Sequence, residues 1–371
     1  MKKRVIAILA SLAVMTTLLA GCGSGNKNAT DNNKANNKTE TEKPVEKIET
    51  EVKVGLSTDV GGRGDKSFND SAIGGLDKIA EEYTVEPAIL EASSQDDYVP
   101  YLTELAENND LVFGVGFLMK ESLEEAATNA PDSKFAIIDQ NVALPNVVSI
   151  NFKEQEGSFL MGVIAGKMTK TNEVGFIGGI DMELIQRFEA GFYAGVKSVN
   201  PEAAKNLLDR TNVVYTGAFD DTQAGQEAAK QLYNNGADVI FHASGACGLG
   251  LLQEASERRA DGKDVWAIGV DSDQAAMVPD YADAVLSSMM KRVDIATYDT
   301  TKNLIEGNFK GGETVVYGLA EDGVGLAPTT DAYTPADVIE LCNSYKKAIV
   351  DGKFVVPATL EEAATFEPTE L

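Results

Sequence analysis

Histidine and cysteine are both scarce in this chain of 371 residues, which has one His and three Cys. A single histidine disfavours histidine-based catalysis and histidine-rich metal binding. Three Cys spread along the chain cannot form a disulfide framework or a four-ligand zinc site. We therefore expect no bound metal, no cofactor and no disulfide between Cys247 and Cys342.

Positive charge is also in short supply. Lys and Arg total 32 against 58 Asp and Glu, which gives a net charge of −26. Binding to nucleic-acid phosphates needs clustered Lys and Arg, so we expect no nucleic-acid partner. Apolar mass is plentiful, since 43% of the residues are hydrophobic. A chain of this length and composition suggests two packed domains.

The amino terminus has the order of features of a bacterial lipoprotein signal. Three positive residues at 2–4 precede residues 5–20, which carry no charge and are too few for a comfortable membrane span. The run ends in Leu-Ala-Gly before Cys22, which resembles the lipobox. We expect 1–21 to be cleaved and Cys22 to carry the lipid that anchors the protein outside the cytoplasmic membrane. An ordinary secretory signal with an incidental cysteine is the alternative.

Residues 22–50 form a segment of different composition. They are rich in Asn, Lys, Thr and Glu and almost lack large apolar side chains. Such a segment cannot bury enough surface to offset its chain entropy. We predict a flexible tether between the lipid and the folded part.

From residue 52 onward, short β-rich runs alternate with helical periodicity, in one half of the chain and then again in the next. The β-rich runs fall at 52–56, 85–90, 111–113 and 135–138, and again at 174–177, 213–215, 239–241 and 266–270. This alternation predicts the α/β class with parallel, doubly wound sheets. Two Rossmann-like lobes in series predict a bilobal solute-binding architecture, the type I periplasmic-binding-protein fold.

The chain is expected to pass between the lobes more than once. The lobes are assigned discontinuous ranges: 52–152 with about 284–312, and 153–283 with about 313–371. Crossings are expected near Phe152, near Ala284 and, for a third time, within 311–317. Hinge closure around a ligand is the expected motion.

Motifs that hold nucleotide phosphates are missing. Neither the P-loop pattern nor the dinucleotide-binding glycine pattern occurs, and the Gly-rich turns at 61–64 and 245–250 have the wrong spacing. In open α/β sheets, ligands bind beyond the carboxyl ends of the strands. The residues that follow the predicted strands are therefore the candidate site.

These residues include aromatic rings, carboxylates and glycines. Rings supply faces for a planar ligand, and carboxylates accept hydrogen bonds from ring N–H, amide or hydroxyl donors. A ligand phosphate would face Asp59, Asp139 and Asp271, which is unfavourable. This chemistry favours a nucleoside over a nucleotide.

Several stretches carry a resemblance that runs in order along the chain from residue 52. They include Thr-Asp-Val-Gly-Gly at 58–62 and stretches at 65–69, 114–117, 135–139, 156–162, 188–192, 269–274 and 288–294. Together they resemble the basic membrane protein family, lipoproteins that bind purine nucleosides for ABC importers. Despite the family's name, this chain is strongly acidic.

The resemblance implies that aromatic rings sandwich the purine. Phe68 from the first lobe and Phe188 from the second are the expected pair, with Phe192 as the alternative second ring. Gly245 would supply a backbone contact. One departure is Cys247, in a turn where the resemblance leads us to expect a small hydroxyl residue or glycine.

The resemblance also implies polar contacts at two ends of the ligand. Asp139 would bond the edge of the base, with Asn69 and Asp59 nearby. Asp271 and Lys291 would hold the ribose hydroxyls.

Taken residue by residue, simpler structural roles remain open. Phe68 could be a hydrophobic staple at a helix start. Phe188 falls on an apolar helical stripe, which is equally typical of a core residue. Asp139 and Asp271 could be helix N-caps, and Lys291 could be a solvated surface charge.

We therefore expect a lipid-anchored, monomeric substrate-binding protein that delivers purine nucleosides (guanosine, adenosine or inosine) to an ABC permease, without catalytic activity. A ligand-sensing receptor component with the same fold is one alternative. A nucleoside-processing enzyme is another, but it would need an acid–base pair, and the only histidine, His242, has no evident partner in the sequence.

Overall fold

The computed structural model describes residues 46–369. The expected signal peptide, the lipidated Cys22 and the tether up to residue 45 lie outside the described residues. The described residues belong to one compact unit. No helix within 46–369 is long and apolar enough to cross a membrane.

The last residues of the expected tether are attached to the folded part. The Ile48 N–H donates to the carbonyl oxygen of Glu82 (2.8 Å), and the Ile48 carbonyl accepts from the N–H of Thr84 (3.0 Å). These bonds pair Ile48 in parallel with Tyr83. The prediction of a flexible tether up to residue 50 is therefore wrong for this stretch. The polar composition around Ile48 predicts no fixed structure, but the backbone of Ile48 is hydrogen-bonded to the folded part.

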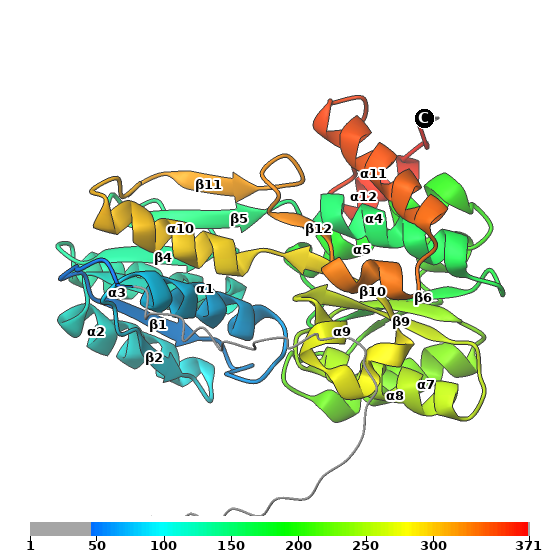
Figure 1. Cartoon of the computed structure of the whole chain (residues 1–371), viewed down its shortest axis with the longest axis horizontal. Coiled ribbons are helices and arrows are strands. Elements are labelled where there is room, and N and C mark those ends of the chain that lie inside the picture. Colours follow the sequence, from blue (N-terminus) through cyan, green and yellow to red (C-terminus); the bar gives the residue numbers. More distant parts are fainter. Residues whose placement is uncertain (1–45, 370–371) are drawn as a thin grey trace, which may run out of the picture. The chain divides into compact units, whose positions relative to one another are not determined.

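Within the described range, one six-stranded sheet defines the first lobe (Figure 1). Its strands are β1 (Val54–Thr58), β2 (Ala88–Glu91), β3 (Leu111–Val115), β4 (Lys134–Ile138), β5 (Val147–Phe152) and β11 (Thr314–Tyr317). They lie in the order β11-β5-β4-β3-β1-β2, and every pairing is parallel. The uninterrupted apolar runs of the central strands fit a sheet that is buried on both faces.

Helices cover both faces of the first sheet. Helices α1 (Phe68–Glu82) and α10 (Val293–Ile305) pack against each other on one face, and α2 (Tyr98–Asn108) packs against α3 (Lys120–Asn129) on the other. Successive residues of a strand point to opposite faces of the sheet. Phe113 belongs to the core under α1, and Val112 belongs to the core under α2 and α3.

The second lobe repeats this plan. Its strands are β6 (Val174–Gly178), β7 (Val213–Tyr215), β8 (Val239–Ala243), β9 (Trp266–Asp271), β10 (Val285–Lys291) and β12 (Val324–Leu326). They lie in the order β12-β10-β9-β8-β6-β7, and all pairings are parallel except that of β12 with β10. The strand orders of the two sheets correspond position by position. The predicted pair of parallel α/β lobes is confirmed.

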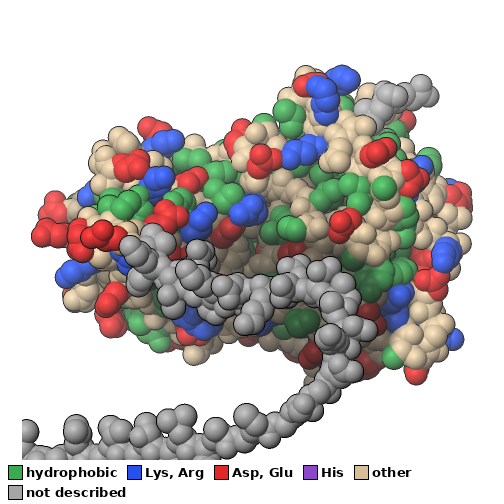
Figure 2. All heavy atoms as spheres, viewed as in Figure 1, with side chains coloured by type: hydrophobic (Ala, Val, Ile, Leu, Met, Phe, Trp, Pro, Cys, Tyr) green, Lys and Arg blue, Asp and Glu red, His purple; other side chains and the backbone are tan. Residues whose placement is uncertain are grey.

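Helices also cover both faces of the second sheet. They are α4 (Glu154–Met168), α5 (Glu183–Val199), α11 (Ala336–Val350) and α12 (Leu360–Thr365) on one face, and α7 (Thr222–Asn234), α8 (Cys247–Ala260) and α9 (Gln274–Met277) on the other. The short helix α6 (Lys205–Leu208) follows α5. Helices α4 and α5 are in backbone contact, since a Cβ at Gly162 would overlap the carbonyl oxygen of Phe192. On the face drawn in Figure 2, Lys and Arg are interspersed among Asp and Glu.

The lobe boundaries differ from the expected ones. Strand β10 pairs with β9, so Val285–Lys291 belongs to the second lobe, and the chain crosses after Lys291 instead of near Ala284. Thr314–Tyr317, expected to be a crossing, is a strand of the first lobe because it pairs with β5. Hydropathy marks these runs as strands, but only pairing decides the sheet to which a strand belongs.

The three crossing segments are bonded to one another. The Lys153 N–H donates to the carbonyl of Tyr317 (2.9 Å), and the Arg292 N–H donates to the carbonyl of Gly323 (2.8 Å). The Glu156 carboxylate at the start of α4 accepts from the N–H of Leu319 (2.9 Å). A hinge built in this way allows the lobes to rotate about a single region.

Candidate functional site

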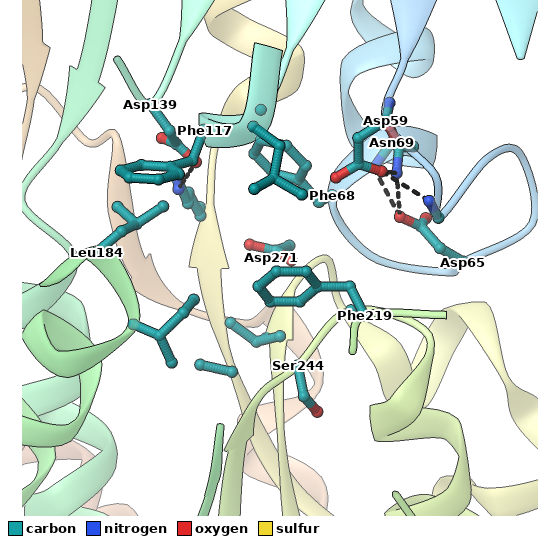
Figure 3. A pocket seen from close by; sticks show the side chains of 18 of the residues that line it. Asp59, Asp65, Phe68, Asn69, Phe117, Asp139, Leu184, Phe219, Ser244 and Asp271 are labelled. Carbon is teal, nitrogen blue, oxygen red and sulfur yellow. Dashed lines mark hydrogen bonds and ion pairs between the residues drawn. The ribbon is translucent and has the colours of Figure 1, made fainter. Parts of the chain in front are cut away.

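A cavity lies between the two lobes, at the carboxyl ends of their strands (Figure 3). Small-molecule sites occur preferentially at such interfaces between domains. Its walls include all eight residues that the family resemblance implies: Asp59, Phe68, Asn69, Asp139, Phe188, Gly245, Asp271 and Lys291. Residues separated by more than 200 positions thus come together because parallel strands end at the same edge.

A hydrogen-bonded acidic cluster forms one end of the cavity. The Asn69 side-chain amide donates to Asp59 Oδ1 (2.7 Å) and to Asp65 Oδ2 (3.0 Å), and its oxygen accepts from the Asp59 N–H (3.2 Å). Asp65 in turn accepts the backbone N–H groups of Ser67, Asn69 and Asp70 at the start of α1. Both N–H donors of the Asn69 amide are therefore engaged within the cluster, so its evident role is to hold Asp59. Asp65 was not expected from the sequence.

One oxygen of Asp59 remains available to the cavity. Gly116 lies opposite with φ +117, and a Cβ there would come within 3.3 Å of Asp59 Oδ2 and 3.4 Å of the Phe68 ring. Only glycine leaves this corner open and adopts this backbone conformation without strain. Burial raises the pKa of Asp59 to about 6, although hydrogen bonds from Asn69 and Gly61 favour the charged form.

A buried charge cluster forms the other end. Lys291 is 2% exposed, and its Nζ lies 2.6 Å from Asp139 Oδ2 and 3.2 Å from Glu154 Oε1. Burial alone would lower the pKa of Lys291, but the carboxylates of Asp139, Glu154 and Asp271 outweigh it and raise that pKa, so the side chain stays an ammonium. The second oxygen of Asp139, Oδ1, is buried and has no hydrogen-bond partner in the described part of the chain. Such an oxygen is ready to accept a hydrogen bond from a ligand. The open alternative that Lys291 is a surface charge is therefore wrong.

Asp139 and Asp271 occupy corresponding positions in the two lobes, following β4 and ending β9. Both are in the left-handed region, with φ +66 and +63, which is strained for a residue other than glycine and recurs at functional sites. Neither acts as an N-cap: Asp139 leads through an extended loop to β5, and the residue before α9 is Asp273. Burial raises the pKa of Asp271 to about 7, against the opposing effects of Lys291 and Ser67.

Phe68 lies at the cavity wall and does not act as a staple. A staple residue precedes the N-cap, whereas Phe68 follows the N-cap Ser67 and is the first residue of α1. It is half-buried. Phe192, the alternative second ring, is fully buried against Phe176 and Phe241 in the core.

Phe188 lines the cavity but is only 3% exposed, and its ring centroid lies 5.6 Å from Lys291 Nζ. A half-buried ring that was not expected, Phe219, follows β7 and enters the cavity from the second lobe, facing the space that Phe68 faces from the first (Figure 3). A Cβ at Gly179 would overlap the Phe219 ring, so the glycine makes room for it. In the sequence, the glycines at 178–179 and 217 are the features that could have indicated a large side chain packed at this place.

Cys247 supports the loop that carries this ring. Its Sγ lies 3.4 Å from the carbonyl oxygen of Ala218 and 3.6 Å from Thr216 Oγ1. The N–H of Ala246 donates to the carbonyl of Phe219 (2.8 Å). The remaining wall residues are mostly apolar or small: Gly61, Phe117, Leu118, Met182, Leu184, Ile185, Ala243, Ser244 and Val270.

Comparison with known families gives the context of this site. The model of the Bmp family, described as "ABC transporter substrate-binding protein PnrA-like", matches residues 52–359. The chain belongs to this family. It is accordingly an ABC transporter substrate-binding protein, which binds a small solute and works with a transporter permease.

Individual relatives agree with this assignment. The chain is 39% identical to the CD4+ T-cell-stimulating antigen of Listeria innocua, over 96% of this chain and 99% of the relative. It is 34% identical to the ABC transporter nucleoside-binding protein BmpA of Lactococcus lactis, over 96% of this chain and 100% of that one. The crystal structure of an ABC transporter solute-binding protein from Aeropyrum pernix superposes with a TM-score of 0.74 at 30% identity, covering 85% of this chain and 96% of that chain.

Proposed function

We propose that the protein captures purine nucleosides, of the guanosine, adenosine and inosine class, between its lobes and delivers them to the permease. The observation that carries this proposal is the pair of half-buried rings, Phe68 and Phe219, that face one space from opposite lobes with buried carboxylates around it. Ring faces on two sides suit a flat heterocycle. The name of the Lactococcus relative, a nucleoside-binding protein, supports the same ligand class.

The acidic cluster suits the base. Asp59 Oδ2 is an acceptor beside the Phe68 ring, and purine bases carry ring N–H or amino donors on their edges. Asn69 acts through Asp59, because both of its amide protons are already donated to carboxylates. We therefore assign Asp59 to the base and Asn69 to its positioning.

The charge cluster suits the ribose. Asp139 Oδ1 and the Asp271 carboxylate can accept from sugar hydroxyls, and the Lys291 ammonium can donate to a hydroxyl oxygen. The family resemblance implied Asp139 at the edge of the base. Its 2.6 Å bond to Lys291 instead favours grouping it with the ribose end, and Figure 3 draws Asp139 apart from Asp59 and Asn69.

The charge balance of the cavity favours a nucleoside over a nucleotide. Lys291 is the one cation among the described wall residues, against Asp59, Asp65, Asp139 and Asp271. The ammonium is also already paired with Asp139 and Glu154. A phosphate would therefore be placed among carboxylates with no free cation to bind it.

We further propose that binding involves no catalysis and that Cys22 carries a lipid anchor on the extracytoplasmic side. His242 is buried between Gln274 and Ser244, and burial lowers its pKa to about 4, which does not suit a general base at neutral pH. Incubation with inosine should release no hypoxanthine. Mass spectrometry of the mature amino-terminal peptide should find a lipidated cysteine, and Cys22→Ser should abolish the lipid.

Titration calorimetry of the purified chain tests the ligand class. We expect guanosine, adenosine or inosine to bind with Kd of about 1 μM or tighter, which corresponds to about −8 kcal/mol. Guanosine monophosphate should bind at least about tenfold more weakly. No heat with any nucleoside, combined with heat from a sugar or a peptide, would contradict the proposal.

A further inference from the structure

We propose that Gln274 is a positioning residue that clasps the second lobe to the first over the bound ligand, and that His242 holds Gln274 in the orientation this requires. For its ligand, the proposal rests on the proposed function. The clasp comprises Lys66 and Ser67 of the first lobe with Ser272 and Gln274 of the second.

The clasp joins two loops at the rim of the cavity. The Gln274 Nε2 amide donates to the carbonyl of Lys66 (3.2 Å), and the Ser272 hydroxyl donates to the carbonyl of Ser67 (3.4 Å). The Ser67 hydroxyl donates to the carboxylate of Asp271. Since Asp271 lines the cavity, the clasp closes directly beside the ligand space.

The orientation of the Gln274 amide follows from its partners. Its Oε1 lies 3.1 Å from the Val270 N–H, which can only donate, so the oxygen must face this group. The NH₂ group then points away, toward Lys66. His242 Nε2 lies 2.8 Å from the same oxygen, so this ring nitrogen must carry the proton.

The other ring nitrogen of His242 connects the clasp to the cavity. Nδ1 is the unprotonated nitrogen and accepts from the Ser244 hydroxyl (3.2 Å). Ser244 is one of the residues that line the cavity. The resulting chain runs from Ser244 through His242 and Gln274 to the backbone of the opposite lobe.

The space for these two side chains is built into the second lobe. A Cβ at Gly248 would overlap the His242 ring, and a Cβ at Gly269 would overlap Gln274 Oε1. Both His242 and Gln274 are fully buried. A neutral histidine fits this arrangement, because burial lowers its pKa well below neutrality.

The acceptor on the first lobe is equally fixed. Lys66 has φ +54, a conformation that is uncommon outside glycine. Its N–H is held by the Asp70 carboxylate (3.2 Å), and the N–H of Ser67 is held by Asp65 (3.0 Å). The carbonyl of Lys66 therefore meets Gln274 from a rigid turn.

The decisive variant is Gln274→Glu in the full-length chain. The Glu carboxylate still accepts the hydrogen bonds from Val270 and His242. Its second oxygen replaces the NH₂ donor, so it repels the carbonyl oxygen of Lys66. We expect the Kd for guanosine to rise at least about tenfold, mostly through faster dissociation. We also expect X-ray scattering to give a larger radius of gyration for this variant than for the wild type. Gln253→Glu makes the same change at a half-buried site on α8 that does not line the cavity, and it should alter the Kd less than twofold. Ser272→Ala, at a half-buried site, should weaken binding by about two- to fivefold.

The single histidine provides a readout that needs no ligand. ¹⁵N NMR of the wild-type chain should show one imidazole with a protonated Nε2 and an unprotonated Nδ1. A protonated Nδ1, or Gln274→Glu binding within twofold of Gln253→Glu, would overturn the proposal. Failure of the wild type to bind any nucleoside would refute the proposed function instead, and the imidazole tautomer and the scattering difference would still decide the clasp.

Discussion

The two walls of the cavity are built differently. The first-lobe wall carries Asp59, Asp65 and Asn69, whose hydrogen bonds are satisfied within that lobe. The second-lobe wall is mostly apolar, and its two charged groups depend on the other lobe: Asp271 accepts from Ser67, and Lys291 pairs with Asp139. The acidic cluster of the first wall is therefore complete in either lobe arrangement, whereas Asp139 of that wall and the two charged groups of the second wall find these partners only when the lobes meet.

This difference suggests an order of events. A nucleoside can be recognised by the preformed acidic cluster of the first wall, and the second lobe then covers it with a ring face and apolar contacts. Contacts made only in the closed state mainly slow dissociation. Changes to each wall should therefore have distinguishable effects.

The largest effect is expected where the two walls share a charge. Lys291→Met leaves Asp139 buried without its cation and leaves Glu154 with Arg187 alone, at 3.6 Å. The change should lower the free energy of unfolding by about 3–5 kcal/mol and weaken guanosine binding at least about 100-fold. Urea unfolding and calorimetry measure the two effects. Lys263→Met, at an exposed turn after α8, is the matched control. A loss of less than about 1 kcal/mol in the free energy of unfolding for Lys291→Met would show that the charge cluster does not stabilise the contact between the two walls.

The next effect separates the two candidate rings of the second wall. Phe219→Ala should raise the Kd by roughly 5- to 150-fold, because a lost stack costs about 1–3 kcal/mol, and should leave stability nearly unchanged. Phe188→Ala should instead lower the free energy of unfolding by about 3–5 kcal/mol, because that ring is buried. If Phe188→Ala weakened binding without loss of stability, and Phe219→Ala lowered stability without weakening binding, the second stacking ring would be Phe188.

The pH dependence compares one carboxyl from each wall. Burial raises the pKa of Asp59 to about 6 and that of Asp271 to about 7, from an ordinary value of 3.8. The folded state then holds more protons than the unfolded state between about pH 4 and 7, so the free energy of unfolding should fall as pH rises through this window. Asp271→Asn should flatten this fall more than Asp59→Asn, as measured by urea unfolding of the ligand-free protein. Unchanged slopes in both variants would contradict the burial account.

The smallest effect concerns the support of the second ring. Cys247→Ser keeps a donor and an acceptor near Ala218 and Thr216, so the Kd for guanosine should change less than about threefold. Cys247→Val removes both and should have the larger effect of the two. Equal binding by both variants would mean that Cys247 does not position Phe219.

Sequence reasoning succeeded where the signal is local. Strand and helix alternation predicted both lobes, and the rule that ligands bind at the ends of strands led to Asp59, Asp139 and Asp271. The family resemblance brought in Phe68 and Lys291. These residues lie in short motifs that can be recognised from the sequence alone, without knowing which residues lie near them in space.

The failures come from contacts distant in sequence. The lobe to which Val285–Lys291 belongs depends on pairing with β9, and the partner of Lys291 is Asp139, 152 positions away. Phe219 follows a strand of only three residues, and its direction depends on the space left by Gly179, which follows a different strand. Hydropathy periodicity carries none of this information.

The central claim is that a purine nucleoside lies between the two walls. A crystal structure of the protein grown with guanosine tests it most directly. We expect the base between the rings of Phe68 and Phe219, with its edge at Asp59 and its ribose hydroxyls at Asp139, Asp271 and Lys291. A base stacked on neither ring, or a cavity that excludes guanosine while the protein binds another solute there, would contradict the account.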